Sequence, residues 1–518
     1  MLSARISLFL TFIFFCLGIF GVLHHEIWLD EAHHFLLARD SNSISELAYN
    51  ARYDGHPLLW NVILFVITRF THDPLWMQVA NVVIMSLAVF IFLRRAPLKA
   101  TVKILIVFSY YFLFEYTVIS RNYALGVLLL VLACSLLFAE KKNYALIFGV
   151  LLLLAGTHLY SLFIAVVLSL VAVNDYSRTT AGKIPRSTFT LLYVVFISAV
   201  LLLVWIARPP ADHFIWNYDP DPYLSFKRIG KGASVFFKGL FPFPNITRYN
   251  CWNTNIFVDL SKNLSIIPSA LCLLIPAVLF HKHRQALWLF YCAGLAIALF
   301  IFISPVIAAS RYFGFIFQLF IAALWAMKYF PEGPSFFGSR LGALFEKMNA
   351  RFAGIFIGSM LVVQVASGIL FYVFDAFRPF SESKHVAEYI QQNRNPGDII
   401  AVRNHSTGPP ISAHLDRKLF YVENNSLQSF CLWNTNPYMI SDEEMYERVS
   451  ALRQQTPDSV KVLLVLSFSR DTPLSNDRYG VAYRHAGADY RLLKEFHGGM
   501  VRSENYQLFE VTKPTDER

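Results

Sequence analysis

The segment between residues 24 and 34 is dense in side chains that can exchange protons. It reads His24-His25-Glu26-Ile27-Trp28-Leu29-Asp30-Glu31-Ala32-His33-His34. Asp30 and Glu31 follow an apolar stretch, so both lie at the edge of a low-dielectric medium. Ionising two adjacent carboxylates there is costly unless a cation or a substrate hydroxyl compensates them. A carboxylate within reach of a hydroxyl can act as a general base; the alternative is a solvated loop with ordinary charges.

Histidines are concentrated in the same region. Six of the 15 histidines fall between residues 24 and 74. Histidine and carboxylate side chains are suitable ligands for a divalent ion, so a metal site is one interpretation. The spacing His-Glu-x-x-His does not occur, because His25-Glu26 is followed by Ile, Trp and Leu. The alternative is interfacial histidines that make hydrogen bonds, and the predicted chemistry requires no cofactor.

More polar side chains stand where apolar stretches end, on the side predicted for Asp30. They are Glu115, Arg121, Tyr123, His158, Tyr160, Arg311 and Tyr312. Charged side chains are costly in a bilayer, so they usually line a cavity or pair with one another. Two arginines and one or two histidines facing a common cavity would suit a phosphate or pyrophosphate. Structural ion pairs, for instance between Glu115 and Arg121, are the alternative.

The composition indicates the medium around these residues. Of 518 residues, 55% are hydrophobic and only 15% are charged, whereas soluble proteins carry about 25% charged residues. We predict eleven membrane spans at residues 6–23, 75–93, 101–118, 122–139, 143–157, 161–173, 188–207, 264–280, 286–303, 312–327 and 352–373. The first is interpreted as a retained span and not a signal peptide, because no small-x-small cleavage site follows it. The block 143–173 requires a break near residues 156–160.

The distribution of lysine and arginine orients the spans. With the N-terminus in the cytoplasm, the inner segments hold 16 Lys and Arg in 61 residues, and the outer loops hold 12 in 121. This bias is typical of positive-inside topology, so the net charge of +10 does not indicate a nucleic-acid partner. Counting the 15 apolar residues 56–70 as a span would invert the topology downstream. We therefore predict an interfacial or re-entrant helix there, within the outer loop 24–74.

The chain divides into a membrane region, residues 1–373, and a C-terminal region, residues 374–518, with the composition of a soluble domain. An odd number of spans places the C-terminal region outside the cell or in the periplasm. Helix and strand signals alternate in it, which predicts a small α/β domain. Helices are expected at 381–392 and 441–454, and strands at 398–403, 418–422, 460–467, 490–496 and 506–511.

Two of the six cysteines, Cys251 and Cys431, lie on the predicted outer side. Cys251 belongs to the long outer loop 208–263, and Cys431 belongs to the C-terminal domain. Each stands beside a Trp-Asn-Thr-Asn sequence. An outer location is oxidising in most cells, so one interpretation is a disulfide that ties the loop to the domain. Two unrelated free thiols are the alternative, because a disulfide needs a short distance that the sequence does not show.

The order of these motifs resembles that of the GT-C glycosyltransferases. The matching features are a first span followed by Trp28-x-Asp30-Glu31, then Gly55-His56-Pro57-Leu58-Leu59, then Ser120-Arg121-Asn122-Tyr123, then Ser310-Arg311-Tyr312. The resemblance is greatest to the branch that contains the protein O-mannosyltransferases and the bacterial lipid A aminoarabinose transferases. It covers residues 1–373, and the C-terminal domain is similar to those of many bacterial members.

The resemblance implies transfer of a sugar from a polyprenyl-phosphate carrier to an acceptor, with inversion, at the outer face of a bacterial inner membrane. It implies that Asp30 activates the acceptor and that Glu31 supports it. Arg121 and Arg311, with His56, His158, Tyr123 and Tyr312, would bind the donor phosphate or lipid. Glu115 would be a second acidic residue. The acceptor would be a lipid-linked glycan, lipid A, a polysaccharide or a protein.

Two other functions stay open from the sequence. A transporter or flippase is one, although no two halves of the chain resemble each other, as inverted repeats would. A polymerase or ligase of lipid-linked glycans is the other, since the outer loop 208–263 is long enough to carry such chemistry.

Overall fold

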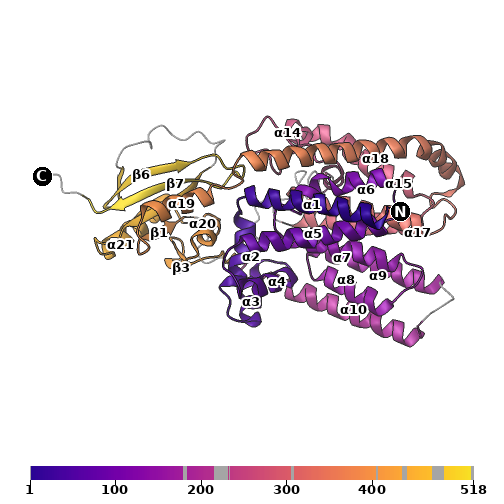
Figure 1. Cartoon of the computed structure of the whole chain (residues 1–518), viewed down its shortest axis with the longest axis horizontal. Coiled ribbons are helices and arrows are strands. Elements are labelled where there is room, and N and C mark those ends of the chain that lie inside the picture. Colours follow the sequence, from indigo (N-terminus) through magenta and orange to yellow (C-terminus); the bar gives the residue numbers. More distant parts are fainter. Residues whose placement is uncertain are drawn as a thin grey trace.

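The computed structural model describes residues 2–178, 184–214, 232, 234–304, 309–403, 406–434, 440–468 and 483–514. A bundle of helices occupies one end of the elongated molecule, and a smaller unit built around a sheet occupies the other (Figure 1). Residues 215–231 and 233 of the outer loop 208–263 lie outside the described residues. The described helices of the bundle are α1 (Ala4–His24), α2 (Leu29–Arg39), α3 (Ile44–Asn50), α4 (Leu59–Thr68), α5 (Leu75–Arg95), α6 (Ala100–Val107), α7 (Asn122–Leu137), α8 (Tyr144–Ala155), α9 (Leu159–Arg178), α10 (Arg186–Ile206), α13 (Val235–Leu240), α14 (Ile256–Leu260), α15 (Ile266–Phe280), α16 (Arg284–Ile303), α17 (Ser310–Tyr329) and α18 (Gly338–Phe377).

Among the described residues, seven helices are long and apolar enough to cross a membrane, which makes the chain an integral membrane protein. They are α1, α5, α9, α10, α16, α17 and residues 352–377 of α18. The helices α4, α7, α8 and α15 are apolar but shorter, with 10 to 17 residues. The expected break between two spans is present, because α8 ends at Ala155 and α9 begins at Leu159. The count of eleven spans stays a prediction.

The predicted span 101–118 is not a single helix. It consists of α6, which ends at Val107, and a one-turn π-helix, η2 (Tyr110–Glu115). Phe108 caps the C-terminal end of α6, and Ser109 caps η2, since its hydroxyl accepts a hydrogen bond from the Phe112 amide. Gly368 of α18 lies against this turn: a Cβ there would come within 2.9 Å of the Tyr110 nitrogen. Hydropathy alone does not reveal this break, because every residue of η2 before Glu115 is apolar or aromatic.

The C-terminal domain contains a seven-stranded mixed sheet in the order β3-β2-β1-β4-β7-β6-β5. Its strands are β1 (Ile399–Val402), β2 (Leu419–Tyr421), β3 (Ser426–Gln428), β4 (Val462–Phe468), β5 (Tyr483–His485), β6 (Ala488–Phe496) and β7 (Asn505–Thr512). β1 is parallel to β2 and to β4, and the remaining pairs are antiparallel. Its helices are α19 (Ser383–Asn393), α20 (Gly408–Leu415) and α21 (Asp442–Gln455).

The predicted elements of this domain are all present within a few residues of their expected bounds. Ser441 caps α21 through a hydrogen bond from the Glu444 amide. Sequence reasoning missed α20, β3 and β5, of which the two strands are only three residues long. Missing α20 matters more, because this helix packs against α2, which carries Asp30. The domain therefore contacts the predicted catalytic loop directly.

Candidate active site

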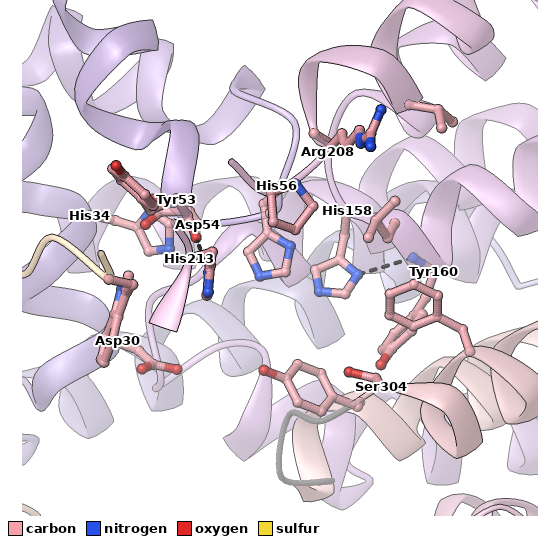
Figure 2. A pocket seen from close by; sticks show the side chains of 18 of the residues that line it. Asp30, His34, Tyr53, Asp54, His56, His158, Tyr160, Arg208, His213 and Ser304 are labelled. Atoms are coloured by element: carbon pink, nitrogen blue, oxygen red, sulfur yellow. Dashed lines mark hydrogen bonds and ion pairs between the residues drawn. The ribbon is translucent and has the colours of Figure 1, made fainter. Parts of the chain in front are cut away.

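A cavity of about 550 Å³ lies beside the first outer loop. Its walls come from α2, from residues 53–56, from the N-terminal ends of α7, α9 and α17, and from the C-terminal ends of α10 and α16. Trp433 of the C-terminal domain also lines it. Figure 2 shows Asp30 on one side of this space, His56 and His158 facing each other near its centre, and Arg208 beyond them. Residues from across the sequence therefore converge on one cavity.

Asp30 is held in the cavity by two arginines. One carboxylate oxygen, Oδ2, lies 2.8 Å from Nη1 of Arg121 and 3.1 Å from Nη2 of Arg311. Asp30 stands in the first turn of α2, where a negative charge is favoured by the helix dipole. About a fifth of the Asp30 side chain stays exposed, whereas both guanidinium groups are largely buried. The structure thus brings together three of the charged residues that the sequence singled out, Asp30, Arg121 and Arg311.

The two cations determine the charge state of Asp30. Burial raises the pKa of Asp30, but the guanidinium groups of Arg121 and Arg311 outweigh this effect and hold the pKa below its ordinary value. Asp30 is therefore ionised near neutral pH, as a general base must be. The same ion pairs also reduce its basicity, since a carboxylate stabilised by cations binds a proton less readily.

Aromatic rings surround Arg311. The guanidinium carbon lies 5.0 Å from the ring centre of Trp28, 5.9 Å from that of Trp252 and 4.8 Å from that of Tyr312. Trp28 and Trp252 meet edge to face, with their ring centres 4.9 Å apart. A guanidinium in such surroundings stays charged and gains cation–π attraction. Its Nε–H is buried and has no partner among the described residues, so it can still donate to a ligand.

Glu31 points away from the cavity although it follows Asp30 directly. Its carboxylate accepts hydrogen bonds from the amides of Trp28 and Ser120, at 3.2 and 2.5 Å, and lies 3.0 Å from Nε2 of His25. Nδ1 of His25 in turn contacts Asp375 of α18 at 2.8 Å. Burial lowers the pKa of His25, but Asp375 and Glu31 together raise it well above its ordinary value. Glu31 therefore joins α2 to α18 and to the segment that carries Arg121.

Four of the five histidines that line the cavity form two groups, and the fifth, His213, donates from Nε2 to the Tyr53 carbonyl at 2.8 Å. On α2, Nε2 of His33 lies 2.8 Å from Oδ1 of Asp54, and Nδ1 of His34 lies 2.9 Å from Oδ1 of Asn61. His56 and His158 face each other with ring centres 4.5 Å apart. Within the described parts of the chain, no three His, Cys, Asp or Glu side chains form a group that could hold a metal ion.

His56 and His158 are available as hydrogen-bond donors. Burial, followed by the charge of Arg121, lowers the pKa of His56 to about 4, so its ring is neutral at physiological pH. Nδ1 of His158 accepts a hydrogen bond from the Tyr160 amide, which leaves the proton on Nε2. His158 Nε2 and His56 Nδ1 are both buried without a partner among the described residues. Both rings can bind an anion without adding charge to the cavity.

Two other predicted residues lie close to the cavity without lining it. Glu115 is buried and accepts hydrogen bonds from the Tyr110 hydroxyl at 2.5 Å and the Trp252 indole at 3.1 Å. It does not pair with Arg121, so the suggested structural ion pair is absent. The guanidinium carbon of Arg121 lies 5.8 Å from the ring centre of Tyr123. Glu115 thus positions Trp252, and Tyr123 supports Arg121.

The C-terminal domain contributes two residues that sequence reasoning missed. Trp433 closes one wall of the cavity and lies 6.2 Å from His33, ring centre to ring centre. Glu504 accepts a 2.8 Å hydrogen bond from the amide of Leu29, the first residue of α2. Burial raises the pKa of Glu504 to about 8, and the charges of Asp30 and Glu31 act in the same direction. Glu504 is therefore a positioning residue for the helix that carries Asp30.

Replacing Glu504 by alanine is expected to lower any activity that depends on Asp30, because α2 loses an acceptor for a buried N–H, at a cost of about 1–3 kcal/mol. Replacing it by glutamine should preserve activity, since the amide oxygen still accepts that bond. The raised pKa makes the folded state bind a proton that the unfolded state releases. Stability of the wild type should therefore fall as pH rises from about 5 to about 8.

The measurement is thermal unfolding in detergent, with the difference between wild type and Glu504→Gln followed against pH. The glutamine variant should lack that part of the pH dependence. Equal activities of the alanine and glutamine variants would contradict the positioning role.

Of the two alternatives for Cys251 and Cys431, the structure has the free thiols and not the disulfide. Cys251 and Cys431 are both buried, and neither is bonded to the other. They occupy different surroundings, since Cys251 lies near Arg378 and Cys431 lies near Asp54 and Glu423.

Backbone interactions join the long outer loop to the C-terminal domain instead. Phe214 donates its amide hydrogen to the Trp433 carbonyl at 2.9 Å, and His213 forms an antiparallel bridge with Asn434. A second connection comes from Asn250, whose side chain donates to the Met500 carbonyl at 2.9 Å.

No protein-family model matches the chain, and no curated protein matches it. Among solved structures, it is similar to ArnT from Cupriavidus metallidurans bound to undecaprenyl phosphate, with 11% identity, a TM-score of 0.49 and 98% of each chain covered. The apo form of the same protein gives 10% identity, a TM-score of 0.46 and the same coverage.

The arabinofuranosyltransferase AftD from Mycobacteria gives 12% identity and a TM-score of 0.39 over 100% of this chain and 40% of that one. ArnT and AftD are both GT-C glycosyltransferases, the group that the sequence motifs resemble.

Proposed function

We propose that this protein is a membrane glycosyltransferase that moves a sugar from a polyprenyl-phosphate carrier to an acceptor hydroxyl or amine. The observation that carries the proposal is the arrangement of Asp30 between Arg121 and Arg311 in an outer cavity. A transfer from a lipid phosphate needs a base for the acceptor and cations for the departing phosphate. One ionised carboxylate and two buried guanidinium groups supply both within a single cluster.

The proposed reaction is a single displacement with inversion. Asp30 removes a proton from the acceptor hydroxyl while the acceptor oxygen forms a bond to the anomeric carbon. The bond from that carbon to the phosphate oxygen breaks, and its electron pair stays on the oxygen. The products are a glycoside and the carrier phosphate, and the proton on Asp30 passes to water or to that phosphate. Arg121, Arg311 and the neutral rings of His56 and His158 donate hydrogen bonds to the phosphate oxygens.

The far end of the cavity is apolar and suits a lipid chain. Leu201, Val204 and Trp205 of α10 and Phe300 of α16 line it. Trp205 is 71% exposed at the surface of the bundle, so this end opens toward the bilayer. Arg208 follows the helix directly and marks the change from apolar to polar lining. The cavity thus has a charged end beside the C-terminal domain and an apolar end among the membrane helices.

The deciding experiment uses purified protein in lipid vesicles with a polyprenyl-phosphate donor carrying a radiolabelled sugar. Formation of a labelled glycoside supports a glycosyltransferase, whereas movement of intact donor between leaflets supports the flippase. Chain growth on a lipid-linked glycan would identify the polymerase or ligase. A panel of donors and acceptors then identifies the sugar and the acceptor, and assays with and without a chelator test the need for a divalent ion.

We further propose that the cavity and the C-terminal domain face the outer side of a bacterial inner membrane, with the N-terminus in the cytoplasm. The density of lysine and arginine in the inner segments supports this orientation. A reporter fused to the C-terminus that is active only in the periplasm should be active. Activity of a cytoplasm-specific reporter at the same position would reverse the topology.

A further inference from the structure

Asp30 and the donor phosphate must compete for the same two arginines. In the structure both guanidinium groups contact a single oxygen of Asp30, one at 2.8 Å and one at 3.1 Å. A general base in two ion pairs is weakened, because the cations stabilise its ionised form. An anion that enters the cavity would draw the cations toward itself and restore basicity to Asp30. Base strength and phosphate binding are therefore linked through Arg121 and Arg311.

The charges of the cluster fit this exchange at both ends of the reaction. Two arginines and one carboxylate leave one unbalanced positive charge, and a sugar phosphodiester carries one negative charge. After transfer, Asp30 holds a proton and is neutral, while the carrier phosphate is a monoester that carries about two negative charges at neutral pH. Two arginines then balance that phosphate alone. The cluster is therefore neutral before and after the reaction, and after it the phosphate is the anion that remains to pair with the arginines.

We propose that Arg121 and Arg311 pass from Asp30 to the carrier phosphate during the reaction, so that Asp30 becomes a strong base only when the donor is in place. This inference rests on the proposed function. It explains why the structure combines a buried arginine pair with the residue that must accept a proton. Without donor, Asp30 stays paired and would not activate an acceptor or water.

The geometry leaves room for such a change. The Nε–H groups of Arg121 and Arg311 are buried without a partner among the described residues, so each guanidinium can bind an anion from a second direction. Asp30 is more exposed to the cavity than either arginine. Other titratable groups lie close enough for their charges to interact with that of Asp30. They are His33, His56, Tyr123, Cys431 and Glu504. Only the two arginines form ion pairs with it among the described residues.

The test is the binding of polyprenyl phosphate, the expected product, to the full-length protein in detergent at about pH 7, where a phosphate monoester with a pKa of about 6 is mostly dianionic. Calorimetry in two buffers of different ionisation enthalpy measures the protons taken up. Exchange predicts uptake of up to about one proton, because Asp30 loses its cations and gains a dianion beside it. If the dianion binds while both arginines stay paired with Asp30, no protons should be taken up, or a small number should be released.

Infrared difference spectra identify the group that is protonated. A protonated-carboxyl band should appear on binding in the wild type and in Asp54→Asn. Asp54 is a carboxylate of the same cavity that contacts His33 and His34 and forms no ion pair with an arginine among the described residues. The band and the proton uptake should be absent in Asp30→Asn, which should bind the phosphate at least as tightly as the wild type. Glu504 can contribute a similar band, so each comparison is repeated with Glu504→Gln.

Three results would overturn the exchange. The first is binding without proton uptake, and the second is uptake that persists unchanged in Asp30→Asn. If the same preparation transfers sugar, either result rejects the exchange and leaves the glycosyltransferase intact. The third is a protein that neither binds polyprenyl phosphate nor transfers sugar, which rejects both.

Discussion

Replacing Asp30 by asparagine should reduce sugar transfer by a factor on the order of 10²–10⁴, the usual contribution of a general base, or abolish it. The asparagine has nearly the same shape, but it cannot accept the proton of the acceptor. Folding should be retained, because the amide oxygen can still accept a hydrogen bond from Arg121 or Arg311. Donor binding should be retained or strengthened, since both arginines lose a competing negative charge.

Turnover with radiolabelled donor, together with a separate donor-binding assay, measures the two effects. Asp73→Asn is the matched control: this exposed aspartate of the same outer loop accepts only local bonds, including one from the Leu75 amide, which asparagine can also accept. Near wild-type turnover in Asp30→Asn would reject Asp30 as the base. Before the donor binds, the wild-type Asp30 should stay ionised below the usual range of aspartate titration, because the arginines lower its pKa.

Replacing Arg121 or Arg311 by alanine should weaken donor binding by about 2–4 kcal/mol, the cost of removing one phosphate ligand from a buried site. That corresponds to a decrease of roughly 30- to 1000-fold in affinity. Acceptor affinity should change much less. Direct binding of donor and the apparent acceptor affinity are measured on the same variants.

Arg52→Ala is a suitable control for both arginine variants. Arg52 lies in the same outer loop, and its guanidinium stacks on Tyr49 and Tyr53 instead of contacting Asp30. If an arginine variant changed only the apparent acceptor affinity, that arginine would not be a phosphate ligand. Lysine at either position should recover only part of the affinity, because an ammonium cannot make the two parallel hydrogen bonds of a guanidinium.

The charged centre of the site could be predicted because membranes make such residues conspicuous. Asp30, Arg121 and Arg311 each stand where an apolar stretch begins or ends, and the outer ends of spans meet on one side of the bilayer. What the sequence could not show is that both arginines contact the same oxygen of Asp30. That geometry depends on how α2, α7 and α17 pack, which hydropathy does not encode.

The contributions of Glu115, Glu504 and Trp433 could not be predicted for a different reason. Glu115 has the position expected of a cavity residue, but the π-helical turn η2 directs it toward Tyr110 and Trp252. Glu504 and Trp433 come from a domain whose own pattern shows only ordinary strands and turns. Their roles depend on tertiary packing. The Glu504 carboxylate accepts a bond from Leu29, 475 residues away in the sequence, and the Trp433 ring lies beside His33, 400 residues away.

The single helix α18 has a consequence for the lipids in which the protein works. It is 40 residues long, or roughly 60 Å at 1.5 Å per residue, about twice the hydrocarbon thickness of a bilayer. Near its C-terminal end, Asp375 contacts His25, which contacts Glu31 on the helix of Asp30. A bilayer of different thickness changes the tilt that suits such a rod. We therefore expect turnover to pass through an optimum as the acyl-chain length of the lipid is varied. A change in the tilt of α18 would move Asp375 and, through His25 and Glu31, the helix that carries Asp30.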